Sequence, residues 1–312
     1  MKPAIVILGS LNMDFVVRVP HLPIPGETVL GHGFETLPGG KGANQACAAG
    51  RAGADNVAVK MLGRVGYDVF GDQLKASLAA SGVDVSGVHA TQEQPTGVAL
   101  IWVDKAGQNS IVVASGANHA MRPEDTGAMR SALQGAAYAL FQLETPLAVV
   151  EGALRIAREL GVRTILDPAP AQPLTRELLS QVDILTPNES EALTLLGRAP
   201  ERVDPDQAPV LAEALLALGP KAVVLKLGDQ GSFYWDGHAA IRQAAFHVDA
   251  VDSTAAGDTF NGALAVALAR NPEIGPALEF ASAAAAISVT RAGAQASIPT
   301  LREIEYFVSR TF

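Results

Sequence analysis

The 312-residue chain has a single cysteine, few aromatic residues (5%) and fewer basic than acidic residues. With only Cys47, no intrachain disulfide can form, which fits a reducing compartment. We expect the Cys47 thiol to be buried and to serve only in packing. The 23 Lys and Arg against 32 Asp and Glu leave a net charge of -9. This balance argues against a protein that binds nucleic acid or an anionic membrane through a basic face.

Long hydrophobic runs are also missing. The first apolar run, at residues 4–8, is broken by Gly9 and Ser10, whereas a signal peptide needs a longer apolar stretch and a cleavage site. Residues 281–289 are apolar but too short for a membrane helix, which needs about 20 such residues. The sequence therefore predicts a soluble cytoplasmic protein with no targeting or membrane segment. The six histidines show no metal-ligand spacing.

Short apolar runs of strand length alternate with segments of helical periodicity. For example, the run at 138–143 is followed by Leu147, Val150 and Leu154 at helical spacing. This alternation predicts an α/β fold in which helices cover both faces of a mostly parallel sheet. Ligands of such sheets lie beyond the carboxyl ends of the strands. Polar or glycine residues follow the apolar runs at those ends, namely Asn12, Asp14, Glu144, Asp167, Asn188 and Gly228.

Two regions, at about residues 15–37 and 96–115, do not follow this alternation of strands and helices. The first contains strand-like runs at 15–17 and 28–30, and the second predicts a hairpin with its turn at 104–108. We expect both insertions to form one small β-sheet lid on a single α/β domain spanning residues 1–312. The alternative is that they add edge strands to the main sheet.

The most specific motif is the string at 252–262, Asp-Ser-Thr-Ala-Ala-Gly-Asp-Thr-Phe-Asn-Gly. The residues after Asp258 predict a helix, so residues 255–258 would form its N-terminus, where free amides and the helix dipole attract anions. An acid in that turn can accept a proton from an attacking hydroxyl while the amides hold a phosphate. An isolated Asp there would be a capping charge. The complete string favours the catalytic interpretation.

A glycine-rich turn at 39–46, Gly-Gly-Lys-Gly-Ala-Asn-Gln-Ala, is the second motif. It precedes a small-residue helix at 43–51 and places free amides, Lys41 and Asn44 at the helix start. It is neither a Walker loop nor a Rossmann fingerprint. Taken alone, the turn is weak evidence, and an ordinary structural turn is the better explanation of it.

Together the two strings resemble the two signatures of the PfkB-type carbohydrate kinases, in the version typical of their ribokinase branch. The segments at 9–14, 96–100, 115–118 and 186–191 resemble the same family, so that the resemblance extends from about residue 5 to residue 299. It implies a ribokinase-like αβα sandwich and transfer of the γ-phosphate of ATP to the 5-hydroxyl of D-ribose, giving D-ribose 5-phosphate and ADP. A related kinase of deoxyribose, a nucleoside, fructose or another sugar is the alternative. A non-catalytic sensor is disfavoured by the intact Asp258.

The resemblance also implies roles for individual residues. Asp258 would be the general base, and the amides of Ala255, Ala256, Gly257 and Asp258 would form the anion hole for the γ-phosphate. The groups implied to hold the sugar, by hydroxyl-binding side chains or backbone, are Asn12, Asp14, Gly40, Lys41, Asn44 and Glu144.

For the nucleotide, the resemblance places Asn188 and Glu191 near the phosphates, with Glu191 acting through Mg²⁺ and its waters. Asn188 could equally cap a helix that starts at Glu189. The base would lie against the 283–287 helix and residues Lys226, Gly228 and Gly231, although the two glycines also suit an ordinary turn before 232–235. Ser282 stands where the family often has Asn or His beside the adenine.

A monovalent cation, usually K⁺, is the last ligand that the resemblance implies. Its ligands would be the Asp252 carboxylate, four carbonyls and one hydroxyl, from Asp252, Thr254, Ser288, Arg291, Gly293 and Ser297. From spacing alone, the 288–297 segment is a plain surface loop. We also expect two lids to pair into a homodimer, because a small sheet must bury its apolar face.

Overall fold

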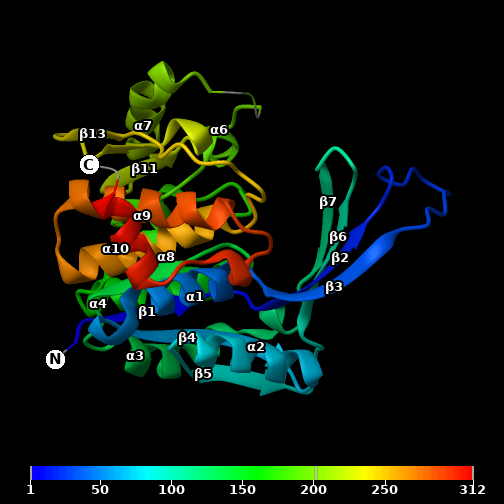
Figure 1. The fold of residues 1–312 in the computed structure, drawn as a ribbon. Helices are drawn as coiled ribbons and strands as arrows, with labels where there is room; N and C mark the ends of the chain where they lie inside the picture. Colours follow the sequence, from blue (N-terminus) through cyan, green and yellow to red (C-terminus); the bar gives the residue numbers. More distant parts are fainter. Residues whose placement is uncertain (1, 200, 202, 311–312) are drawn as a thin grey trace.

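A nine-stranded sheet forms the centre of the protein (Figure 1). The computed structural model describes residues 2–199, 201 and 203–310. The strand order is β13-β12-β11-β10-β9-β8-β1-β4-β5, in which β12 pairs antiparallel with both of its neighbours, β11 and β13, and all the other pairs are parallel. In that order the strands are β13 (Ala240–Gln243), β12 (Ser232–Trp235), β11 (Ala222–Lys226), β10 (Ile184–Leu185), β9 (Arg163–Leu166), β8 (Tyr138–Phe141), β1 (Ala4–Leu8), β4 (Ala58–Gly66) and β5 (Val83–Thr91).

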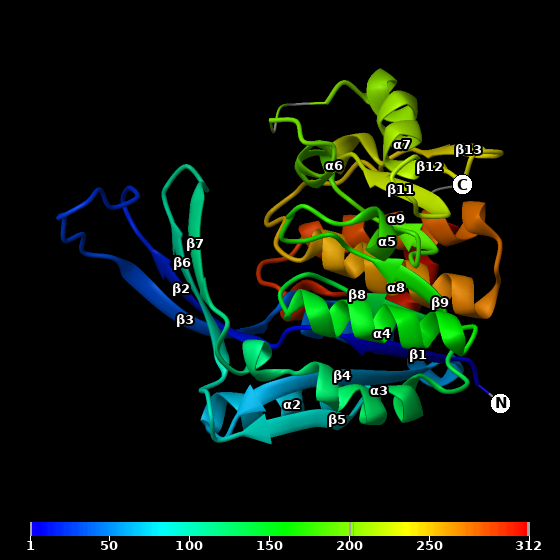
Figure 2. The same cartoon turned by 180° about the vertical axis from the view of Figure 1, so that it is seen from behind.

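Helices cover both faces of this sheet (Figures 1 and 2). One face carries α1 (Lys41–Gly53), α2 (Val69–Ala80), α8 (Ala256–Arg270), α9 (Ile274–Val289) and α10 (Leu301–Ser309). The other carries α3 (Thr126–Leu133), α4 (Leu147–Glu159), α5 (Arg176–Leu179), α6 (Glu189–Leu195) and α7 (Ala208–Leu216). The shorter 3₁₀ turns are η1 (Ala54–Asn56), η2 (Gly116–Ala120), η3 (Pro123–Asp125), η4 (Pro205–Gln207), η5 (Gly228–Gln230) and η6 (Gln295–Ser297).

Strand periodicity explains the two cores. Side chains alternate across a strand, so Ile5 and Ile7 of β1 enter one core while Val6 and Leu8 enter the other. Both faces are therefore apolar, as the continuous apolar runs predict. The predicted doubly covered α/β fold is confirmed.

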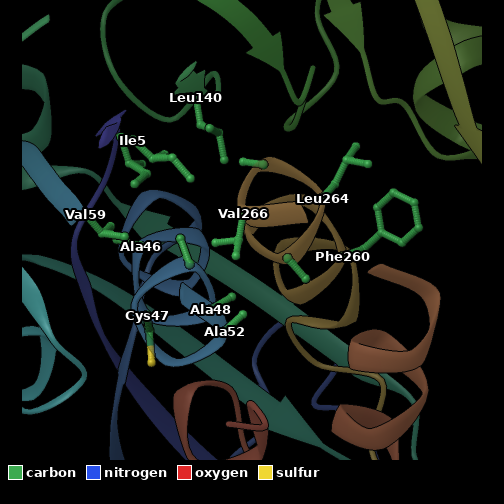
Figure 3. Packing of buried hydrophobic residues seen from close by; sticks show 14 of the residues in the cluster. Ile5, Ala46, Cys47, Ala48, Ala52, Val59, Leu140, Phe260, Leu264 and Val266 are labelled. Atoms are coloured by element: carbon green, nitrogen blue, oxygen red, sulfur yellow. The ribbon is translucent and has the colours of Figure 1, made fainter. Parts of the chain in front are cut away.

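Helices α1 and α8 pack unusually closely because their facing residues are small (Figure 3). A Cβ atom at Gly262 would lie 2.5 Å from the Gln45 carbonyl oxygen and 2.6 Å from the Ala48 Cβ, so only glycine permits this approach. Cys47 is fully buried in the same layer, as predicted, with its Sγ 3.3 Å from the Ser81 Oγ. The close packing brings the N-terminus of α1 next to that of α8.

A separate four-stranded sheet projects from this body (Figures 1 and 2). Its order is β3 (His32–Gly39), β2 (Asn12–Arg18), β6 (Gly97–Val103) and β7 (Asn109–Ala114), with β2 and β6 parallel. The alternative of extra edge strands on the main sheet is therefore wrong. We call this four-stranded sheet the lid.

One predicted lid strand is also wrong. Residues 28–30 form no strand, and the return strand begins at His32. The partner strand β2 ends at Arg18, which pairs with His32, so residues 28–30 extend past any partner despite their β-forming composition.

Within the described residues, no helix is both long enough and apolar enough to cross a membrane.

Candidate functional site

Asp258 lies in the first turn of α8 and is held by two side chains from the first turns of α1. Asn44 Nδ2 donates a hydrogen bond to Asp258 Oδ2 over 3.0 Å, and Gln45 Nε2 donates one to Oδ1 over 3.1 Å. Both motifs of the sequence thus meet at one carboxylate. The two hydrogen bonds fix its orientation.

The surroundings of Asp258 adjust its proton affinity. Burial is the largest influence and raises its pKa to about 6, and the Asp167 carboxylate acts in the same direction, against Lys41 and the two amide donors. Burial would favour a neutral Lys41, but the four carboxylates around it raise its pKa instead. Near pH 7 the site therefore combines an ionised carboxylate of moderate basicity with a charged ammonium.

The backbone at the start of α8 has the strained conformation of a tight turn. Ala255, the N-cap residue, has φ 59°, and no side chain caps the helix. The first-turn amides therefore have no intrahelical partners. The Ala256 amide is hydrogen-bonded to the Ser253 carbonyl over 3.2 Å, which leaves the amides of Gly257 and Asp258 the more available for an anion.

The residues implied to bind sugar lie at the junction of lid and body. Asn12 and Asp14 are at the start of β2, and Gly40 is the N-cap residue of α1. Glu144 Oε2 accepts hydrogen bonds from the Ser10 hydroxyl and, over 3.1 Å, from the Lys41 amide.

Some polar atoms in this region have hydrogen-bonding capacity that the protein itself does not use. Asn118 Nδ2 donates to Asn12 Oδ1 over 2.8 Å, which leaves the Asn12 amide group to donate elsewhere. Asn44 Oδ1 is buried and has no partner in the described part of the chain. Burial, together with Glu144 and Asp258, raises the pKa of Asp14 to about 7. A set of donors and acceptors with unused capacity suits a polyhydroxylated ligand.

Two adjoining cavities lie at the N-terminus of α8. One, of about 370 Å³, is mainly apolar and includes Phe246, Val248, Ser282 and Ala286 among its lining residues. The second, of about 510 Å³, is polar and contains acids, amides and lysines, including Lys41, Asp167, Asn188, Glu191 and Asp258. Both are lined by Lys226, Gly228, Ser253, Ala256 and Gly257, so they form one continuous depression. An apolar end joined to a polar end at a helix N-terminus suits a nucleotide.

The glycines of the 228–231 turn line the apolar cavity. Gly228 and Gly231 both have positive φ, at 54° and 89°, and enclose the 3₁₀ turn η5 between β11 and β12. The turn expected from the sequence is therefore present, and it lies against the cavity.

Asn188 caps α6, as the alternative interpretation proposed. Its side chain accepts a hydrogen bond from the Glu191 amide and the Glu191 side chain accepts one from the Asn188 amide, each over 2.8 Å. Burial raises the pKa of Glu191, although Lys226 opposes this. Among the described residues, no group of three His, Cys, Asp or Glu side chains is arranged to hold a metal ion directly. The Glu191 carboxylate lines the polar cavity, and one carboxylate at such a place suits a Mg²⁺ ion that keeps its waters.

The segments implied to hold a monovalent cation are adjacent. The Val251 and Asp252 amides both donate to the Val289 carbonyl, and the Gly293 amide donates to Asp252 Oδ2 over 2.9 Å. Thr254 donates to Asp252 Oδ1 through its amide and its hydroxyl. Burial opposes but does not outweigh these hydrogen bonds, which lower the pKa of Asp252.

The rest of this cation loop supplies neutral oxygens. Ser288 and Ser297 are fully buried, and the Arg291 side chain turns to Glu303 over 2.6 Å, leaving the Arg291 carbonyl as the group available to an ion. One carboxylate with a lowered pKa among carbonyls and hydroxyls fits a large monovalent cation.

Four residues contribute to the site without having been predicted to do so. Ser10 and Asn118 position Glu144 and Asn12, while Gln45 and Asp167 form a hydrogen-bonded group with Asp258. Gln45 stands beside Asn44 in the glycine-rich motif, and Asp167 follows an apolar strand run. Ser10 and Asn118 lie in the segments 9–14 and 115–118 that resemble the family, and Asp167 was among the polar residues expected at the ligand-binding ends of the strands.

Comparison with known proteins gives consistent matches. The family model described as pfkB family carbohydrate kinase matches residues 2–301. The ribokinase of Haemophilus influenzae is 42% identical over 308 residues, covering 99% of both chains. A structure of Arabidopsis thaliana ribokinase complexed with ribose and ATP has a TM-score of 0.88 and 34% identity, covering 99% of both chains. A deoxyribokinase of Salmonella typhi is 32% identical over 306 residues, with 98% of both chains covered.

Proposed function

Because the chain belongs to the pfkB family of carbohydrate kinases, we propose that it is an ATP-dependent kinase of D-ribose, which yields D-ribose 5-phosphate and ADP. The observation that carries the proposal is the position of Asp258. Its carboxylate lies between the sugar-binding side chains and the cavity that suits a nucleotide, at an anion-binding helix start. The similar Arabidopsis protein, complexed with ribose and ATP, supports both substrates.

Asp258 is the general base of this reaction. With Asn44 and Gln45 occupying one direction on each oxygen, the remaining lone pairs accept the proton of the 5-hydroxyl. The first-turn amides of α8 stabilise the charge on the transferring phosphoryl group, and Asn12, Asp14, Lys41 and Glu144 orient the sugar. Positioning and charge stabilisation suffice for phosphoryl transfer, so the reaction needs no covalent enzyme intermediate.

Two cations complete the proposed site. Mg²⁺ would be held through its waters near Glu191 and would neutralise phosphate charge when bound. K⁺ would be held by the Asp252 carboxylate, the carbonyls of Thr254, Ser288, Arg291 and Gly293 and the Ser297 hydroxyl. It would order the loop beside the anion hole.

The lid supports a homodimer. Both faces of β7 are exposed, and Ile111, Val112 and Val113 are between 44% and 53% exposed, an unusual state for consecutive apolar residues. One face would cover the sugar while the other would pack on a partner lid. We treat residues 1–312 as one kinase domain bearing this lid, acting in the cytoplasm.

The test is an assay of ADP formation over a panel of D-ribose, 2-deoxyribose, fructose and adenosine, each with and without K⁺. We expect the highest kcat/KM with D-ribose. The similarity to a deoxyribokinase makes 2-deoxyribose the second candidate, and a higher kcat/KM with that sugar would replace the proposed substrate. The absence of ADP formation with every substrate of the panel would contradict the assignment of kinase activity.

A further inference from the structure

Asp167 is a buried acid with no role in the reaction described so far. It follows β9 and is only 3% exposed. Its Oδ1 accepts a hydrogen bond from Lys226 Nζ over 2.9 Å, and its Oδ2 accepts one from Gln45 Nε2 over 2.9 Å. A buried carboxylate with a separate partner on each oxygen holds both partners in place.

The orientation of the Gln45 amide is fixed by its neighbours. Gln142 Nε2 donates to Gln45 Oε1 over 2.6 Å, so the amide oxygen must face Gln142. The two hydrogens on Gln45 Nε2 then point to Asp167 and Asp258. This amide is therefore a bridge between the two carboxylates, with all its donors used.

Lys226 connects the same network to the nucleotide side of the site. It lines both cavities, and its Nζ would lie 3.4 Å from a Cβ atom on Gly257. The ammonium thus lies over the first turn of α8, where the phosphates would bind. Without Asp167, this long side chain would be free to leave that position.

We propose that Asp167 is a positioning residue of the kinase reaction, which holds the Lys226 ammonium over the start of α8 and orients the Asp258 carboxylate through Gln45. The proposal rests on the proposed function. It links the phosphate-binding end of the site to the general base through three side chains.

Electrostatics gives the network a measurable signature. The charged groups that face Asp258 are Lys41 on α1, Asp14 on β2 and Asp167, with Lys226 behind Asp167. Removing the negative charge of Asp167 makes Asp258 easier to ionise, whereas removing the positive charge of Lys226 makes it harder. Opposite substitutions must therefore move the pH dependence in opposite directions.

The experiment measures kcat against pH at saturating ribose and ATP, together with ADP and AMP affinity by calorimetry. Both oxygens of Asp167 accept hydrogen bonds, one from Gln45 Nε2 and one from Lys226 Nζ. The Asp167→Asn side chain has the same shape but only one oxygen, so its NH₂ group meets one of these two donors and that hydrogen bond is lost. We expect kcat to fall at least tenfold and its acid limb to move to lower pH by about half a unit. In Lys226→Met we expect the limb to move to higher pH, with ADP affinity falling more than AMP affinity.

Asp183→Asn is the matched control. Asp183 also pairs with a lysine, Lys221, and accepts a hydrogen bond from Thr164, but near the opposite end of β9. This variant should keep the wild-type pH profile, and thermal melting of all three variants checks their folding. Acid limbs unmoved in both site variants, or moved in the same direction, would overturn the role of Asp167 while the kinase assignment stands. A wild-type protein that forms no ADP would overturn both.

Discussion

Asn44 and Asp258, 214 positions apart in the chain, are joined by a 3.0 Å hydrogen bond between the first turns of two helices. Because the amide donates, Asp258 is held as an acceptor, which is the state a general base needs. The bond also places the base beside Asn44 Oδ1, a buried acceptor with no partner in the described part of the chain. The proposed base and the proposed sugar-binding residue Asn44 are thus parts of one hydrogen-bonded unit.

Replacing Asp258 with Asn should abolish most of the catalysis. General-base catalysis contributes roughly 10²- to 10⁴-fold, so we expect kcat to fall within that range while ribose still binds. Steady-state kinetics and calorimetric titration with ribose measure the two effects. A variant with near-normal turnover would contradict the assignment of the base.

The pH dependence should show two separate acid limbs. Asp258 must be ionised to accept the proton and its pKa is raised to about 6, so kcat should fall below about pH 6. Asp14 must be ionised to accept hydrogen bonds from the sugar and its pKa is raised to about 7, so kcat/KM for ribose should fall already below about pH 7. Profiles from pH 5 to 9 measure both, and a kcat/KM limb that persists in Asp14→Asn would exclude Asp14 as its cause.

Asp14 should also cost the folded protein stability at alkaline pH. Its folded pKa, about 7, lies above the ordinary 3.8, so its favourable contribution is complete below about pH 4 and is lost as the pH rises through 7. We expect Asp14→Asn to raise the free energy of unfolding by about 1–3 kcal/mol at pH 8 and by less at pH 5. Urea denaturation measures this. The exposed Asp55→Asn serves as the control and should show no such difference.

Removal of the Asp252 carboxylate should remove the activation by K⁺. Asp252→Ala deletes the only ionised group proposed to bind the cation and the acceptor for the Gly293 amide. We expect the ratio of activities in K⁺ and in tetramethylammonium to fall towards one. The exposed neighbour Asp249→Ala should keep the wild-type ratio. Full K⁺ activation in Asp252→Ala would rule out this site.

A charge on the outer strand of the lid should prevent dimer formation. Ile111→Lys and Val113→Lys each place an ammonium on an apolar strand that the proposed dimer buries. Sedimentation velocity should then detect a monomer. Val210→Lys, on an exposed apolar position of α7, should leave the dimer intact. A wild-type monomer across working concentrations would contradict the lid-mediated dimer.

Local sequence was sufficient wherever a short segment contains its own structural signal. The helix starts at Lys41 and Ala256 follow from glycine and small-residue strings, and the hairpin around residues 104–108 follows from its turn residues. The capping by Asn188 was one of two interpretations that the sequence left open.

Features that depend on distant partners could not be predicted. Residues 28–30 have a strand-like composition but no pairing partner, because β2 ends too early. The hydrogen bond from Gln45 to Asp258 depends on the closeness of α1 and α8, which a single glycine at 262 permits. No local sequence pattern predicts the distance between these two helices.

Strands β2 and β6 are parallel neighbours in the lid, although β3, α1, β4, α2 and β5 lie between them in the chain. A parallel pair cannot form as a local hairpin, and closing so long a loop costs entropy before any contact compensates for it. The hydrogen bonds between β2 and β6 should therefore form after β4 has paired with β1 and β5 with β4. Since Asn12 and Asp14 lie at the start of β2, the proposed sugar site would be completed only after this pairing of distant strands.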